Sequence, residues 1–422
     1  MSYNLPVRSY RLRVVDAELK GHLQALGAVL IEGPKASGKT ETARQLAASE
    51  VLLDVDIQAR QAAAIDPSLV LEGETPRLID EWHLEPAIWD RVRREVDQRS
   101  QPGQFILTGS AVPPDDETRH TGALRITRIQ MRPMTLFETG HSDGSVSLKD
   151  LLAGAAVRSA DRGLDVRELA QVIAVGGWPA IQDLELEAAL QAVRSYLDEI
   201  RRVDISRVGR SRRDPDRVAV LLRSLARNVS TYASVATLAA DTTGGDEPIK
   251  RDTVADYLDA LRRLKIVEDQ PPWAPHLRSK YVLRSEAKRH FVCPSLAVAA
   301  VRASPATILR DPNYLGFLFE SMVTRDLRVY AQASDAEVLQ YKDQDLEVDA
   351  VVRAIDGHWA AFEIKLGQGQ IDEGVGNLLK FARRIDTSKC GEPGALAVIT
   401  GTGYGYERND GIKIIPVGAL GP

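Results

Sequence analysis

Residues 33–40 read Gly33-Pro34-Lys35-Ala36-Ser37-Gly38-Lys39-Thr40 and fit the phosphate-binding pattern G-x-x-x-x-G-K-[ST] at every position. The apolar run Val29-Leu30-Ile31 precedes them, as expected of a buried strand, and helix-forming residues 41–48 follow. A strand, loop and helix in this order direct successive backbone N–H groups toward one point, where a polyphosphate binds. The pattern predicts that all eight residues bind ATP, with Lys39 over the β- and γ-phosphate oxygens and the Thr40 hydroxyl on Mg²⁺.

Two adjacent acids follow a second short apolar run. Residues 76–82 read PRLIDEW, so Asp80 and Glu81 come directly after Leu78 and Ile79. In triphosphatases an aspartate at a strand end holds magnesium, and the following glutamate polarises the attacking water. An exposed acidic turn is the alternative for so short a motif. The separation from Gly33 suits the third strand of the same sheet, which favours the catalytic interpretation.

Another buried strand is predicted at residues 104–110, which read QFILTGS and end in hydroxyl groups. Either Thr108 or Ser110 is expected to contact the γ-phosphate from the neighbouring strand, and the alternative is that they cap a turn. Further along the chain, Arg119, Arg125 and Arg128 are candidates for an arginine that reaches the γ-phosphate of a neighbouring subunit. A role as ordinary surface residues is the alternative for each of the three.

The composition is that of a soluble protein with more than one domain. The chain has 422 residues, of which 44% are hydrophobic and 27% charged, and its net charge is −5. This length predicts two to four domains. No apolar run reaches the length of a membrane span and no signal-peptide pattern is present, so we expect a cytoplasmic protein with no membrane partner. Cys293 and Cys390 stand far apart, which excludes a disulfide scaffold or a cysteine-based zinc site.

Positive charge is concentrated between Gln191 and Asn228. This stretch holds ten arginines, no lysine and five acids, which leaves a local charge of +5. Arginine clusters bind phosphate through planar, bidentate hydrogen bonds. A solvated helix face with internal acid–arginine pairs is the alternative. A second basic stretch runs from His276 to His290, with five Lys or Arg residues and one acid.

The middle of the chain predicts helices and a small DNA-binding-type module. Residues 176–179 read GGWP and predict a tight turn with a buried Trp178. Residues 214–270 have the order of a winged helix, with three predicted helices, the second capped by Ser234, and a strand at 266–268. The candidate recognition helix carries Asp252, Asp256 and Asp259, which are unfavourable beside DNA phosphates. A role in packing or protein contact is therefore favoured over base reading.

A second chemical site is predicted in the last third of the chain. Asp349 lies in a predicted strand at 347–352, Glu363 and Lys365 in one at 359–365, and Glu320 in a predicted helix at 315–329. Glu363 and Lys365 share a face because strand side chains alternate. The pattern D-x(13)-E-x-K is that of restriction-endonuclease-like cores, in which Asp349 and Glu363 would bind Mg²⁺ while Lys365 and Glu320 assist phosphodiester cleavage. The alternative is a nuclease-like fold without nuclease activity.

Along its whole length the chain resembles the bacterial and archaeal ATPases that join an AAA-type domain to a C-terminal DUF4143 region. The segments that carry the resemblance are GPKASGKT, PRLIDEW, FILTGS, MRPMTLFE, GGWP, YLDEI, LRSLARN, GFLFE, EVDAVV and FEIK. The resemblance implies an AAA+ ATPase domain, a winged-helix element and a nuclease-superfamily fold. One departure is Cys293, which stands before Pro294 where relatives usually have Asp. If that Asp has a role in the family, this chain lacks it.

Together these features predict an α/β protein in four parts: a P-loop AAA+ parallel-sheet domain (1–140), a helical connecting or lid region (141–212), a winged-helix-like module (213–275) and a restriction-endonuclease-like α/β domain (276–422). The expected function is Mg²⁺-dependent ATP hydrolysis together with action on DNA through the C-terminal domain. The alternative is an ATP-controlled switch or scaffold that binds a protein partner while the C-terminal fold is inactive. AAA+ sites are commonly completed by an arginine from the next subunit, so a homo-oligomer is also expected.

Overall fold

The computed structural model of the chain describes residues 9–110, 121–208, 213–242, 249–275 and 286–422. The chain divides into two compact units, one made of residues 1–109 and 115–131 and the other of residues 110–114 and 132–422. Within the described ranges, no helix has both the length and the apolar character needed to cross a membrane.

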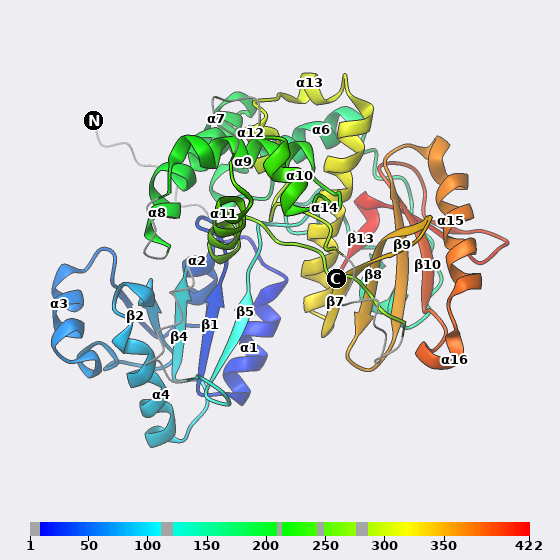
Figure 1. Ribbon diagram of the computed structural model, residues 1–422. Helices are drawn as coiled ribbons and strands as arrows, with labels where there is room; N and C mark the ends of the chain where they lie inside the picture. Colours follow the sequence, from blue (N-terminus) through cyan, green and yellow to red (C-terminus); the bar gives the residue numbers. More distant parts are fainter. Residues whose placement is uncertain (1–8, 111–120, 209–212, 243–248, 276–285) are drawn as a thin grey trace. The chain divides into compact units, whose positions relative to one another are not determined.

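The first unit is built on a five-stranded sheet in which every pair of neighbouring strands is parallel (Figure 1). The order across the sheet is β2-β3-β4-β1-β5. Because all strands run the same way, their carboxyl ends meet at one edge, where ligands bind in open α/β sheets. The strands are β1 (Ala28–Glu32), β2 (Ser49–Leu52), β3 (Arg77–Asp80), β4 (Phe105–Gly109) and β5 (Ile126–Gln130).

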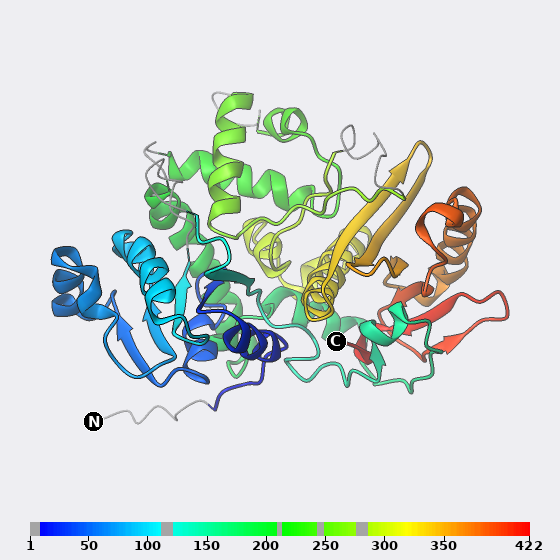
Figure 2. The same cartoon turned by 90° about the horizontal axis from the view of Figure 1, so that it is seen from below.

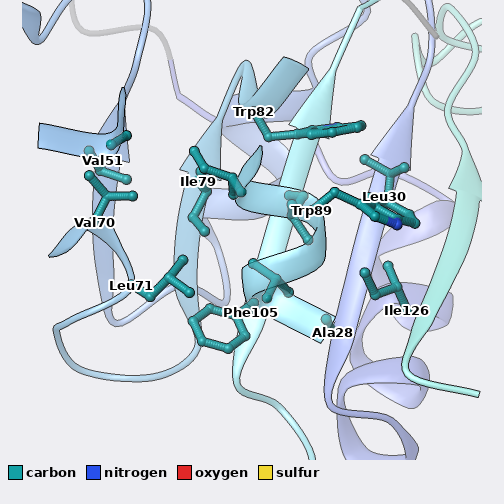
Figure 3. Packing of buried hydrophobic residues seen from close by; sticks show 14 of the residues in the cluster. Ala28, Leu30, Val51, Val70, Leu71, Ile79, Trp82, Trp89, Phe105 and Ile126 are labelled. Carbon is teal, nitrogen blue, oxygen red and sulfur yellow. The ribbon is translucent and has the colours of Figure 1, made fainter. Parts of the chain in front are cut away.

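Successive side chains of β1 point to opposite faces of the sheet and belong to two different apolar clusters. Ala28 and Leu30 belong to one apolar cluster, which includes Trp82 and Trp89 (Figure 3). Val29 and Ile31 belong to the cluster on the other face, with the buried residues of α1. Both faces of β1 are therefore covered, which explains its continuous apolar sequence.

The helices of this unit follow the alternating pattern expected of a parallel sheet. They are α1 (Val15–Ala25), α2 (Lys39–Arg44), α3 (Ile57–Ile65) and α4 (Ala87–Arg99). The predicted helix after the phosphate-binding loop was too long, because α2 ends at Arg44 and the chain reaches β2 at Ser49. The parallel α/β fold of this part of the chain is confirmed.

The second unit begins with a group of short helices. The main helices before the C-terminal sheet are α5 (Leu148–Leu152), α6 (Val166–Val175), α7 (Leu186–Glu199), α8 (Ile205–Arg207), α9 (Pro215–Arg227), α10 (Val235–Ala240), α11 (Arg251–Arg263), α12 (Ser295–Ala300) and α13 (Pro305–Ile308). The turn at 176–179 separates α6 from α7, as expected. Gly176 has φ 74°, and the Nε1 of buried Trp178 donates a hydrogen bond to Ser295 Oγ at 3.0 Å. A side chain on Gly177 would place its Cβ 1.9 Å from the Met134 carbonyl oxygen, so only glycine fits there.

The chain ends in a mixed six-stranded sheet with the order β11-β12-β10-β9-β8-β7. Its strands are β7 (Ala336–Asp343), β8 (Leu346–Ala354), β9 (Trp359–Lys365), β10 (Ala395–Thr400), β11 (Tyr406–Glu407) and β12 (Lys413–Pro416). Helix α14 (Pro312–Gln332) contacts β7, β8 and β9, and α15 (Ile371–Arg384) contacts β8, β9 and β10. Figures 1 and 2 show these two helices on opposite faces of the sheet. Helix α16 (Thr387–Cys390) follows α15, and a small two-stranded sheet pairs β6 (Val146–Ser147) with β13 (Leu420–Gly421).

Candidate functional site

The loop between β1 and α2 has the backbone conformation of an anion-binding nest. Ala36 and Gly38 have positive φ angles of 60° and 98°, which turn successive N–H groups of the loop toward a common point. Gly33 has no room for a side chain, since a Cβ there would lie 2.2 Å from the Met131 carbonyl oxygen. The loop backbone and the first turn of α2 therefore fit a polyphosphate.

Lys39, the first residue of α2, is only 5% exposed and is held over this loop. Its Nζ donates hydrogen bonds to the carbonyl oxygens of Gly33 at 3.1 Å and Pro34 at 2.9 Å. Burial lowers the pKa of Lys39 to about 8, although the nearby carboxylates of Glu81 and Asp80 oppose this shift. A phosphate oxygen placed in the nest would offer this ammonium a charged acceptor, which makes a stronger hydrogen bond than a carbonyl.

The predicted magnesium residues lie together at the carboxyl edge of the sheet. The Thr40 hydroxyl donates a hydrogen bond to Asp80 Oδ1 at 2.8 Å, and the Thr108 hydroxyl donates to the same oxygen. Asp80 is the last residue of β3, and Thr108 lies near the end of the adjacent β4. This grouping of two hydroxyls and a carboxylate beside Lys39 fits Mg²⁺, which prefers hard oxygen ligands.

Glu81 follows Asp80 in a conformation that only a minority of non-glycine residues adopt. Its φ is 53°, and its backbone N–H donates to Thr108 Oγ1 at 3.4 Å. One carboxylate oxygen lies 3.2 Å from Nδ1 of His83. Residues with positive φ are found repeatedly at active sites, where surrounding contacts hold them in place. The turn places Glu81 directly after Asp80, at the carboxyl end of β3.

Four residues ahead of or within α1 and α2 support the loop and were not predicted. The buried guanidinium of Arg13 donates to the Ser37 carbonyl at 2.7 Å. The Tyr10 hydroxyl donates to Asp16 at 2.6 Å and is hydrogen-bonded to the Thr42 hydroxyl at 2.9 Å. These contacts fasten the segment before α1 to the loop and to α2. Because they join residues far apart in sequence, the local pattern gave no signal for them.

The remaining candidates of the first site have separate surroundings. Arg125 forms an ion pair with Asp97 at 2.9 Å, and Arg128 pairs with Glu32 and lies over the Trp89 ring. Arg119 falls outside the described residues. Ser110 is the residue directly after β4 and is buried.

The C-terminal candidates are also brought close together, but lysine ammonium groups contact them. Lys365 Nζ lies 3.0 Å from Glu363 Oε2, as its place on the same face of β9 predicts. Asp349 on β8 accepts a hydrogen bond from the Ile364 N–H at 2.8 Å. Burial raises the pKa of Glu363 to about 8, and the neighbouring Asp349 adds to the shift while Lys365 opposes it.

An additional lysine, Lys288, lies between the other carboxylates. Its Nζ is 2.7 Å from Glu320, 2.8 Å from Glu347 and 3.3 Å from Asp349, and the residue is 1% exposed. Burial alone would lower the pKa of Lys288, but Glu320, Asp349 and Glu347 outweigh it and raise this pKa well above its usual value. The basic stretch from His276 to His290 was the one signal in the sequence that pointed toward Lys288.

This arrangement does not fit a divalent metal. Within the described parts of the chain, no group of three His, Cys, Asp or Glu side chains has the geometry to hold a metal ion. A buried ammonium already contacts Glu320, Glu347 and Asp349, and a second one contacts Glu363. The residues expected to bind Mg²⁺ are thus paired with positive charges of the protein itself.

The helices of the predicted winged-helix-like module are present, and one acid of the third helix, Asp256, has an internal partner. Helices α9, α10 and α11 follow in order, and Ser234 caps α10 by accepting from the Thr237 N–H at 3.0 Å. The predicted strand at 266–268 is replaced by isolated bridges, Val267 to Phe291 and Gln270 to Lys288. In α11, Asp256 accepts two hydrogen bonds from the guanidinium of Arg213, so this acid serves packing.

Three protein-family models match parts of this chain. An AAA domain model matches residues 26–140, which contain the phosphate-binding loop and Asp80. A domain of unknown function, DUF8612, matches residues 166–307, and a second, DUF4143, matches residues 315–420. The N-terminal part therefore contains an AAA-type domain. The chain joins this domain to a DUF4143 domain in one polypeptide.

Comparison with individual proteins adds two similar structures. A Walker-type ATPase of Pyrococcus abyssi is 12% identical, with 70% of this chain and 99% of that chain covered and a TM-score of 0.42. Drosophila ORC bound to DNA is 14% identical, with 68% of this chain and 85% of that chain covered and a TM-score of 0.19. A comparison with curated proteins finds no match.

Proposed function

We propose that this chain binds ATP at residues 33–40 and hydrolyses it with the help of Mg²⁺. One observation carries the proposal: the hydroxyls of Thr40 and Thr108 donate to the same carboxylate oxygen of Asp80. This group lies beside the buried ammonium of Lys39. Thr40 comes from α2, Asp80 from β3 and Thr108 from β4, so their meeting depends on the folded sheet. Triphosphate hydrolysis needs such a combination of cation, hydroxyl and carboxylate.

Each residue has a separate role in this proposal. Lys39 and the loop N–H groups bind the β- and γ-phosphate oxygens, and Thr40 and Asp80 hold Mg²⁺, which supplies positive charge to the phosphates when bound. Glu81 accepts a hydrogen bond from the attacking water and takes its proton. Thr108 orients the Asp80 carboxylate through its hydroxyl and is the candidate on β4 for contact with the γ-phosphate.

The observations on the C-terminal domain favour a switch or scaffold over DNA cleavage. The carboxylates that cleavage would require are paired with Lys288 and Lys365. Asp256 of the candidate recognition helix holds Arg213. We therefore propose that ATP binding and hydrolysis control the contact of this chain with a protein partner. A second copy of the chain, in a homo-oligomer, is one such partner.

One reaction tests ATP hydrolysis and the expected absence of DNA cleavage together. The full-length chain is incubated with ATP, Mg²⁺ or Mn²⁺, and plasmid or single-stranded DNA, and both phosphate release and DNA cleavage are measured. Phosphate release without cleavage is expected. Absence of phosphate release would contradict the ATPase proposal, and cleavage that is lost in Asp349→Ala would show that the C-terminal domain acts on DNA.

A further inference from the structure

We infer that Lys288 is the resident cation of the C-terminal carboxylate cluster, defined here as Glu320, Glu347 and Asp349, and that this cluster binds no divalent metal. The inference concerns the second unit alone. It does not depend on ATP hydrolysis, which takes place at residues of the first unit.

The position of Lys288 is set by its backbone as well as by its side chain. Its N–H donates to the Gln270 carbonyl at 3.0 Å, and the Gln270 N–H donates to the Lys288 carbonyl at 2.8 Å. The Gln270 side chain in turn donates to the Asp349 carbonyl at 2.9 Å. The segment that carries the lysine is thus fixed to the strand that carries Asp349, and the ammonium has little freedom to leave the cluster.

The three donors of the ammonium match the three carboxylates. Glu320 comes from α14, while Glu347 and Asp349 come from β8, so Lys288 joins a helix, a strand and its own segment through one charged group. A divalent ion at the same oxygens would lie close to this buried ammonium and would be repelled by it. The second oxygen of Asp349 already accepts from Ile364, and Glu363 is paired with Lys365.

Binding of Mn²⁺ to the full-length, nucleotide-free protein tests the inference. Wild type and Asp349→Asn are compared by electron paramagnetic resonance, which counts bound ions, so that ions at the phosphate-binding loop contribute equally to both. Equal numbers of bound ions are expected. If wild type binds one Mn²⁺ more than Asp349→Asn, or more than a Glu363→Gln protein, the cluster is a metal site and the inference is overturned.

Thermal unfolding provides a second test that does not involve metal. Lys288→Met leaves the buried Glu320 and Asp349 and the partly exposed Glu347 without their cation, which is strongly destabilising, so its Tm is expected to fall by about 5 °C or more. Lys342→Met is the matched control, because Lys342 is partly exposed and lies 4.0 Å from the same Glu347. Adding Glu320→Gln to Lys288→Met should recover part of the loss. A Lys288→Met protein as stable as the control would show that Lys288 is not the cation of the cluster.

A different observation, on helices α7, α9 and α12, points to an anion site. We propose that the cavity of about 500 Å³ between these helices binds a phosphate group. It is lined by four arginines against two acids, and the arginines are Arg194, Arg201, Arg223 and Arg302. The small residues Ala219, Ala299 and Ala300 leave space between the long side chains of the arginines.

The pairing of the four arginines leaves positive charge available in this cavity. Arg201 contacts both acids, Asp198 at 2.7 Å and Asp216 at 3.5 Å. Arg194 contacts the neutral Gln191 side chain. The guanidinium groups of Arg223 and Arg302 make no hydrogen bond or ion pair with any residue in the described ranges. Converging guanidinium groups bind phosphate oxygens through bidentate hydrogen bonds.

Two probes distinguish the source of the phosphate. Inorganic phosphate is measured by calorimetry and a labelled single-stranded oligonucleotide by fluorescence anisotropy, both in a Lys39→Ala chain so that the loop at 33–40 does not contribute. Arg223→Gln/Arg302→Gln should weaken at least one probe by about 10-fold or more, whereas Arg310→Gln, exposed and outside the cavity, should not. Binding of the oligonucleotide alone identifies a nucleic-acid backbone as the source. Unchanged binding of both probes in the double variant, or no binding of either by the parent chain, would overturn the proposal.

Discussion

Replacing Lys39 by alanine is expected to abolish ATP hydrolysis and to weaken ATP binding by about 100-fold or more. Lys39 is buried at the start of α2, and its Nζ is held over the loop by the carbonyl oxygens of Gly33 and Pro34. An alanine leaves the β- and γ-phosphate oxygens without this cation. Calorimetric titration with ATP measures the loss of affinity, and phosphate release measures the loss of turnover.

Lys20→Ala is the control for this variant, because Lys20 is an exposed lysine on α1 of the same unit. It should bind and hydrolyse ATP as wild type does. Binding of ATP by Lys39→Ala with unchanged affinity would mean that residues 33–40 are not the phosphate-binding loop.

Replacing Glu81 by glutamine is expected to slow hydrolysis by about 100-fold or more while ATP affinity stays within a few-fold of wild type. Glutamine keeps the size of the side chain and its hydrogen bonds, but it does not take a proton from water. The backbone of Glu81 lies in the left-handed region, φ 53°, where it directs the side chain away from the regular strand. Single-turnover phosphate release measures the chemical step directly.

Glu85→Gln tests whether any nearby carboxylate has the same effect. Glu85 lies four positions along the chain and pairs with Arg60 at 3.1 Å, so its loss should leave turnover nearly unchanged. Unchanged turnover in Glu81→Gln would assign proton transfer to another group.

Local patterns in the sequence predicted much of the first site. The loop at 33–40, the strand before it and the acid at the end of β3 are each encoded within a few residues, and the fold places Thr40 against Asp80 as that pattern indicates. The buried turn at Trp178 was also predictable, since two glycines and a proline exclude a helix.

The features that the sequence did not predict depend on contacts between distant segments. The bond from Arg13 to the Ser37 carbonyl spans 24 positions, and that from Lys288 to Asp349 spans 61. The pattern D-x(13)-E-x-K placed Glu363 beside Lys365, because both lie on one strand, but it carried no information about Lys288. A lysine that neutralises a carboxylate cluster looks in the sequence like any lysine of a basic stretch.

The most direct test of the ATPase site is phosphate release by the full-length chain and by Asp80→Asn across a titration of Mg²⁺. Asparagine keeps an oxygen that can accept from Thr40 and Thr108 but removes the charge that would hold the ion. We expect wild-type turnover to rise with Mg²⁺ and to stop when the ion is chelated, and Asp80→Asn to be slower by about 100-fold or more at every concentration. Equal turnover of the two proteins across the titration would contradict the site described here.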